Sequence, residues 1–149
     1  MSALADELDY RIESELDVIA YLQNLKYALT NKAKITFQEK RRVDGNRDER
    51  YTNTYTMADL FPDEDPIEVL RRELMTLTVK EYLRTVKDLR FPDRQEMREF
   101  GKVYPGNAEV YIKVRVELLA QDGFGAHTTF VMSFHYAEKP FSEETFPYA

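Results

Sequence analysis

A row of polar side chains on one predicted strand, followed by a histidine on the next, has residue types that can cleave RNA without a metal. In "AEVYIKVRVELL" (residues 108–119), Tyr111, Lys113 and Arg115 alternate with aliphatic residues and therefore share one face of the strand. The next predicted strand, "HTTFVMSFHYA", carries His135 near its end. If the two strands pair as an antiparallel hairpin around "QDGFG", His135 lies on the same polar face as those three side chains.

Metal-independent RNA cleavage needs a base for the 2′-hydroxyl, an acid for the departing 5′-oxygen, and cations that stabilise the charge on phosphorus. Histidine titrates near neutrality, so His135 would carry the proton. Arginine is permanently charged and would hold and orient the phosphate. The same Tyr-x-Lys-x-Arg-x-Glu row is also typical of a solvated sheet face, and from the pattern alone that interpretation is the more common one.

The residues that most often bind metals or form covalent intermediates are scarce in this chain. There is no cysteine, which excludes disulfides, thiolate zinc sites and a cysteine nucleophile. The two histidines, His127 and His135, lack a patterned set of carboxylates at ligand spacing. We expect His127 to be an exposed loop residue beside "DGFG", and we expect no metal and no cofactor.

Length and charge favour one domain with a localised basic region. The 149 residues fit a single domain with a real core. The net charge of −6 argues against a nucleic-acid binder, because phosphate affinity comes mainly from lysine and arginine. Basic segments at residues 18–51 and 80–115 nevertheless alternate with acidic ones, which permits one positive cleft on a negative body.

The sequence shows no membrane span and no secretion signal. No apolar run approaches the roughly 18 residues that a spanning helix needs, and "MSALADELDY" is acidic, unlike a basic leader. We therefore expect a cytoplasmic protein without membrane attachment.

The first thirty residues place apolar side chains at steps of three or four, which predicts one long N-terminal helix over residues 1–30. Acidic residues on its other face are favoured near a helix N-terminus. We expect the apolar stripe to face the core or an interface. It consists of Leu4, Leu8, Ile12, Leu16, Ile19, Leu22, Leu25 and Leu29.

The middle of the chain predicts one strand followed by short helices. Residues 33–43 ("AKITFQEKRRV") alternate as a strand, and the dipeptide "DG" after it marks a turn. Asp65 and Pro66 suit the N-cap and the first position of a helix. The stretch "TVKEYLRTVKDLRF" (residues 78–91) predicts a further helix, which Pro92 ends.

Three more strands are predicted at residues 96–104, 108–120 and 127–137, followed by a tail at residues 142–149. Helices first and strands last are typical of an α+β domain. We expect the long N-terminal helix and the short helices to pack on one face of a mainly antiparallel sheet.

Three stretches resemble, in their order, the motifs of MqsR-like toxins of bacterial toxin–antitoxin pairs, within the RelE-type ribonuclease superfamily. They are "RRELMTLTVKEYLRTVKD", "REFGKVYPGNAEVYIKVRV" and "FVMSFHYAEKPF". The resemblance rests on an "LT" helix end, an aromatic-glycine-lysine strand, a "V-Y-I-K" strand and a closing "S-F-H" strand. It covers about residues 34–141.

The resemblance implies a small α+β toxin that cleaves messenger RNA, free or on the ribosome, and leaves cyclic phosphate and 5′-hydroxyl ends. A cognate antitoxin protein would silence it. The implied catalytic residues are His135, Tyr111 and Arg84, the last being the cation after the "LT" motif. Together with the strand alternation, the resemblance assigns substrate binding to Arg98, Lys102, Lys113 and Arg115.

Two other function classes stay open. The protein could instead be a non-catalytic interaction module that binds a partner through its acidic helix or its basic sheet face. A metal-dependent hydrolase is the weakest alternative, because neither histidine has recognisable ligand spacing. The N-terminal helix lies outside the resemblance, and a family-specific addition, an antitoxin contact and a homodimer surface are all open interpretations of it.

Overall fold

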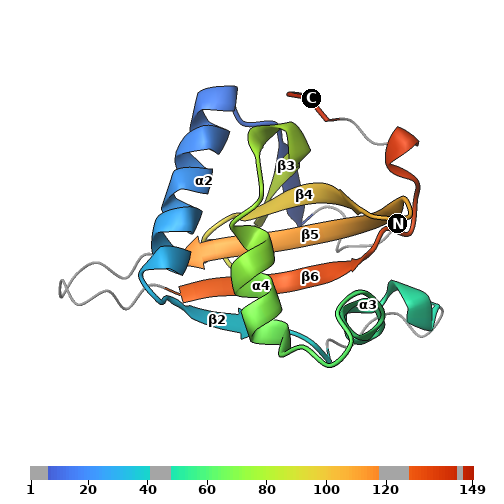
Figure 1. The fold of residues 1–149 in the computed structure, drawn as a ribbon. Coiled ribbons are helices and arrows are strands. Elements are labelled where there is room, and N and C mark those ends of the chain that lie inside the picture. Colours follow the sequence, from blue (N-terminus) through green and yellow to red (C-terminus); the bar gives the residue numbers. More distant parts are fainter. Residues whose placement is uncertain (1–6, 41–47, 118–127, 144–145) are drawn as a thin grey trace.

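The computed structural model describes residues 7–40, 48–117, 128–143 and 146–149. It is an α+β fold in which one six-stranded sheet has the order β1-β3-β4-β5-β6-β2 (Figure 1). Every neighbouring pair is antiparallel except β2 and β6, which are parallel. The strands are β1 (Leu8–Arg11), β2 (Lys34–Phe37), β3 (Tyr82–Asp88), β4 (Met97–Tyr104), β5 (Ala108–Glu117) and β6 (Thr128–Tyr136). The α-helices are α2 (Glu15–Thr30), α3 (Asn53–Leu60) and α4 (Pro66–Leu74).

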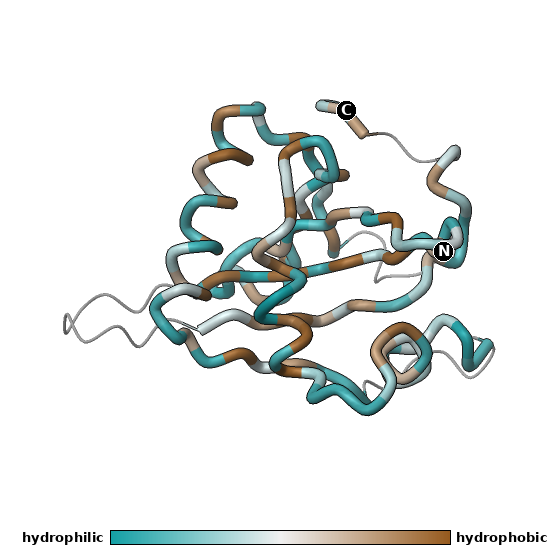
Figure 2. Tube along the Cα trace, viewed as in Figure 1, coloured by the Kyte–Doolittle hydropathy of each residue, from teal (hydrophilic) through white to brown (hydrophobic). Residues whose placement is uncertain are grey.

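One face of the sheet forms the hydrophobic core with α2 and α4. The even-numbered residues of β5, such as Ile112 and Val114, are fully buried together with Leu25 of α2 and Leu70 of α4. In Figure 1 both helices lie on the same side of the sheet, and Figure 2 shows apolar residues recurring along β5 and α2. Helix α3 instead packs against β6, where Asn53 binds the backbone of that strand. The other face of the sheet, on which the odd-numbered residues of β5 stand, is called the polar face below.

The predicted helix over residues 1–30 is wrong over residues 8–14, and its first six residues lie outside the described ranges. Residues 8–11 form β1, which pairs with β3, and α2 begins only at Glu15, after an N-cap at Ser14. Leucines at helical spacing suggested one stripe, but Leu16 is 78% exposed, whereas Leu25 is buried as predicted. A short edge strand leaves little trace in a sequence, because its partner β3 lies more than seventy residues away.

The predicted helix at residues 78–91 is also wrong, because residues 82–88 form β3. A single 3₁₀ turn at Val79–Glu81 precedes this strand, which then runs between β1 and β4. Its tyrosine, threonine and valine residues favour strands, and pairing on both sides outweighs the local helical pattern. The helix that starts after Asp65 and the strands β4, β5 and β6 are confirmed, whereas the strand predicted from residue 33 is confirmed only as β2, which ends at Phe37.

A β-bulge separates the two halves of β6. Lys113 lies opposite Ser133, but Val114 lies opposite Val131, so Met132 has no partner across the pair. Simple alternation along β6 would place Val131 on the same face as His135. The bulge instead puts Val131 in the core, while Ser133 and His135 lie on the polar face opposite Lys113 and Tyr111.

A buried carboxylate ties the N-terminal segment to the sheet. Glu13 accepts hydrogen bonds from Arg98 on β4, at 2.9 and 3.0 Å, and from Thr85 on β3, at 2.6 Å. The backbone N–H of Glu13 donates a hydrogen bond to the Tyr82 hydroxyl at 3.1 Å. Tyr148, near the C-terminus, donates to the Glu13 carbonyl oxygen. Four segments of the chain therefore meet at one residue.

No helix within the described ranges combines the length and the apolar character required to cross a bilayer.

We predict that Glu13→Gln lowers the free energy of unfolding by about 3 kcal/mol at pH 7, because it leaves the largely enclosed Arg98 guanidinium without its counter-charge. Burial raises the pKa of Glu13, but the hydrogen bonds from Arg98 and Thr85 outweigh it and hold the pKa below its ordinary value of 4.5. The stabilisation is therefore present above pH 4.5 and is lost as the pH falls through the folded-state pKa.

Urea unfolding at pH 7 and pH 3 measures this difference. Glu15→Gln is the control, because Glu15 is exposed and its helix-dipole contribution is below about 1 kcal/mol. A loss for Glu13→Gln that is no larger than the control, or that is independent of pH, would contradict the prediction.

Candidate active site

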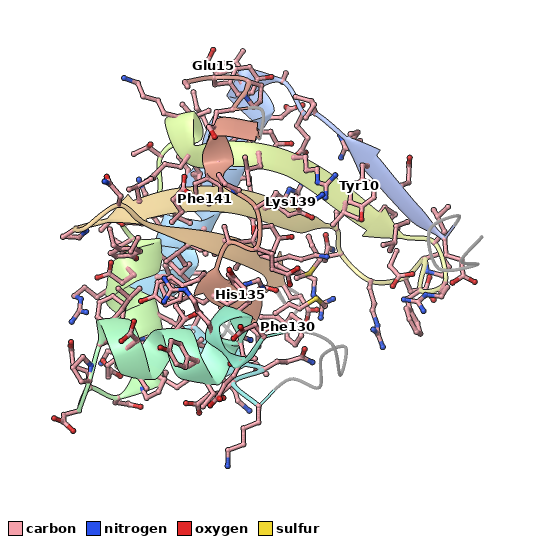
Figure 3. All side chains as sticks on the ribbon, turned by 90° about the vertical axis from the view of Figure 1, so that its right-hand side faces the viewer. Tyr10, Glu15, Phe130, His135, Lys139 and Phe141 are labelled. Atoms are coloured by element: carbon pink, nitrogen blue, oxygen red, sulfur yellow. The ribbon has the colours of Figure 1, made fainter. Side chains whose placement is uncertain are left out.

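The polar face of the sheet contains a pocket of about 300 Å³, which is called the main pocket below. Its floor comes from β3, β4, β5 and β6, and the segment after β6 forms one wall. Figure 3 views the molecule from the right-hand side of Figure 1, where β5 begins and β6 ends, with Tyr10, Phe130, His135, Lys139 and Phe141 labelled. The pocket is lined by Leu83, Arg84, Glu99, Tyr111, Lys113, Ser133, His135, Ala137, Glu138, Lys139 and Phe141.

Tyr111 and His135 are direct cross-strand partners in this pocket. They lie opposite each other on β5 and β6, and their ring centroids are 5.4 Å apart. His135 is only 6% exposed, and its Nδ1 lies 2.9 Å from the carbonyl oxygen of Tyr136. Since a carbonyl can only accept, Nδ1 carries the proton in this contact, and Nε2 is the nitrogen at which the neutral ring gains a proton.

Glu99 on β4 is a functional candidate that the sequence reasoning missed. It is 2% exposed, lies opposite Lys113, and accepts a hydrogen bond of 2.9 Å from Nε of Arg84. The Lys113 Nζ is 4.0 Å from its other carboxylate oxygen. Alternation along β4 could have revealed it, since Glu99 and Gly101 share a face that would meet Lys113 and Tyr111.

The surroundings of Tyr111 keep its phenol protonated. Burial raises the pKa of Tyr111 well above 10, and both the negative charge of Glu99 and a hydrogen bond to that carboxylate add to the effect. Burial lowers the pKa of Arg84, but the hydrogen bond to Glu99 outweighs it, so the net shift is upward. Near neutral pH the pocket therefore offers a neutral phenol donor and a fixed positive charge.

Arg98 and Lys102 do not join this pocket, contrary to the expectation from the sequence. They lie opposite Val114 and Val110, whose side chains are in the core, so both point to the helix-covered side. Arg98 binds Glu13 there, and the Nζ of Lys102 lies 3.4 Å from Glu81. Strand alternation already separates them from Glu99, and it should have overruled the motif match.

Arg115 lies on the polar face but outside the main pocket. Its guanidinium carbon is 4.5 Å above the Phe130 ring, and its Nε is 2.9 Å from Glu117. Arg115 and Lys113 both line a second, smaller pocket of about 60 Å³, and Lys113 lines the main pocket as well. His127 lies outside the described residues.

The structure thus brings four of the seven sequence-predicted residues into one pocket. They are Arg84, Tyr111, Lys113 and His135.

The segment after β6 packs closely against β4 because Gly101 has no side chain. A Cβ atom at this position would lie 2.8 Å from Cζ of Phe141 and 3.0 Å from Cζ of Phe146. Real Cβ atoms essentially never approach so closely, so only glycine permits this packing. The contact places Phe141 as a wall of the main pocket.

We predict that Gly101→Ala lowers the free energy of unfolding by about 1 to 3 kcal/mol, because the new methyl group overlaps the Phe141 ring. The same substitution in a Phe141→Ala background should cost at least about 1 kcal/mol less, since the main obstacle is gone. A double-mutant cycle by denaturant unfolding measures the difference. Equal costs in the two backgrounds would show that Phe141 does not pack on Gly101.

Within the ranges that the structure describes, no three histidine, cysteine or carboxylate side chains come close enough together to hold a metal ion. The chain matches no protein-family model, no curated protein and no solved structure.

Proposed function

We propose that this protein is a metal-independent endoribonuclease, and that it acts in the cytoplasm as the toxin of a toxin–antitoxin pair. One observation carries the proposal. A neutral phenol, an imidazole, a buried carboxylate and two cations, from four different strands, line one pocket of about 300 Å³. A solvated sheet face would not need a carboxylate that is 2% exposed or an imidazole that is 6% exposed.

Glu99 and His135 supply the proton transfers in this proposal. They stand on β4 and β6, on opposite sides of β5, and two strand spacings of about 4.8 Å each separate those strands. A phosphodiester placed over β5 would have one group on each side. Glu99 then takes the proton of the 2′-hydroxyl, and the 2′-oxygen forms a bond to phosphorus. The bond from phosphorus to the 5′-oxygen breaks, and Nε2 of protonated His135 gives that oxygen its proton.

The remaining side chains stabilise the negative charge that develops on the phosphoryl oxygens. Arg84 and Lys113 are the cations beside Glu99, and Tyr111 donates a hydrogen bond from its neutral phenol. Their contacts with Glu99 fix these groups before substrate arrives, so little reorganisation is needed during the reaction. The products are a 2′,3′-cyclic phosphate and a 5′-hydroxyl end.

We predict that purified protein cleaves single-stranded RNA in the presence of EDTA, and that His135→Asn and Glu99→Gln each lower kcat by about 100-fold or more. Asparagine at position 135 can still donate to the Tyr136 carbonyl, and glutamine at position 99 keeps the shape of the carboxylate. Both substitutions therefore remove proton transfer with little change in packing. Tyr111→Phe removes one donor to the phosphoryl oxygens and should cost about 100-fold.

Tyr27→Phe is the matched control, because Tyr27 is exposed on α2, and this helix covers the opposite face of the sheet from the pocket. Gel and mass-spectrometric assays give the rates and identify the cyclic phosphate. The nuclease assignment would be refuted if wild-type protein did not cleave RNA in the presence of EDTA. It would also be refuted if His135→Asn and Glu99→Gln kept full activity.

A non-catalytic interaction protein is the second candidate, and exposed apolar side chains where the chain passes from β1 into α2 favour it. Leu16 is 78% exposed and Ile12 is 53% exposed, next to the acidic first turn of α2. In a toxin, the same side chains would suit the cognate antitoxin.

We predict that Leu16→Glu weakens binding to the product of a neighbouring small reading frame by at least about tenfold. The variant should still fold, because the core side of α2, including Leu25, is unchanged. Calorimetric titration of the two purified proteins measures the affinity, and Lys26→Glu on the same helix is the control. Growth arrest on expression, relieved by that reading frame, supports the toxin. A stable complex with no nuclease activity supports the interaction protein.

A further inference from the structure

Arginine side chains lie over aromatic rings at three places around the polar face. The distances from the guanidinium carbon to the ring centroid are 3.9, 3.9 and 4.5 Å. The arginines belong to the main pocket or to the smaller pocket beside it. The pairs are Arg84 with Tyr10, Arg94 with Phe91, and Arg115 with Phe130.

Two of these rings are open to solvent. Tyr10 is 44% exposed and Phe91 is 40% exposed, so part of each ring stays open to solvent although an arginine lies over it. Tyr10 lies opposite Val86, and Val86 lines the smaller pocket, so the Tyr10 ring stands on the polar face. Figure 3 shows Tyr10 on the same face as Lys139 and His135.

Arg84 connects the Tyr10 ring to the main pocket. Its guanidinium group lies over Tyr10 and also donates from Nε to Glu99 at 2.9 Å. A phosphate held by Arg84 would therefore bring its neighbouring nucleotide within reach of the Tyr10 ring. Lys113 lines both pockets and continues the positive charge along the sheet toward Arg94 and Arg115.

Cations interleaved with exposed rings suit a single strand better than a duplex. Unpaired bases stack on aromatic rings and arginine planes, whereas the bases of a duplex already stack on each other.

We propose that the polar face is a track for single-stranded RNA, in which the base next to the phosphate held by Arg84 stacks on Tyr10. The inference deepens the proposed nuclease function and rests on it for the position of the phosphate. Tyr10 lies on β1, so the N-terminal segment contributes directly to substrate recognition.

The test uses RNA that cannot be cleaved by attack of the 2′-oxygen. A fluorescent 12-nucleotide pool of random sequence with 2′-O-methyl groups, and a hairpin of the same chemistry, are titrated with full-length protein. We expect wild-type protein to prefer the single strand, and we expect Tyr10→Leu to weaken single-strand binding by about tenfold. Tyr10→Phe keeps the ring and should stay within about twofold of wild type.

Tyr27→Leu is the control for loss of an exposed ring on the opposite side of the sheet, and thermal melts confirm that each variant folds. Leucine keeps an apolar contact for Arg84 but has no π-face, so a purely structural role of Tyr10 would leave the preference for single strands unchanged. Preference for the hairpin, no binding by wild-type protein, or equal single-strand affinity in Tyr10→Leu would overturn the inference.

The two proposals fail separately in this design. RNA cleavage by wild-type protein together with unchanged affinity in Tyr10→Leu would leave the nuclease standing and remove the stacking site. Tyr10-dependent binding without cleavage of any RNA would remove the nuclease and leave a single-strand binding face.

Discussion

Alternation of side chains along β5 is the constraint on which the rest of the molecule depends. Val110, Ile112 and Val114 are fully buried in the core, and Tyr111 and Lys113 on the other face line the main pocket. Since the same backbone serves both faces, the hydrophobic core fixes the position of Tyr111 and Lys113 as rigidly as it fixes Ile112. A site built on a central strand is in this way more precisely placed than one built on loops.

Strand β4 shows how the two faces use charge differently. Arg98 and Glu99 are adjacent in sequence but point to opposite sides of the sheet, and each finds a partner of opposite charge there. The Arg98 pair with Glu13 joins β4 to the segment before α2, beside Tyr21 of that helix, so it helps to hold the fold together. The Glu99 pair with Arg84 faces a pocket, where a negatively charged ligand could compete for the arginine.

Much of the site could be predicted from the sequence because it depends on local alternation. The polar face of β5 and its pairing with His135 follow from residue spacing within two neighbouring strands. Alternation along β4 predicts Glu99 on this face equally well, but the family resemblance assigned the role to the neighbouring Arg98. The bulge at Met132 and the strand at residues 8–11 could not be predicted in the same way, because each depends on contacts with distant parts of the chain.

The strand order also has a consequence for how the chain folds. Strands β3 to β6 follow each other as neighbours, so they can assemble through successive local pairings. The two outer strands come from the first forty residues: β1 joins β3, and β2 joins β6 at the far side. Loop closure over such sequence separations is slow and entropically costly. We therefore expect β3 to β6 to form early. The first forty residues then add β1 and β2 late, one at each edge of the sheet.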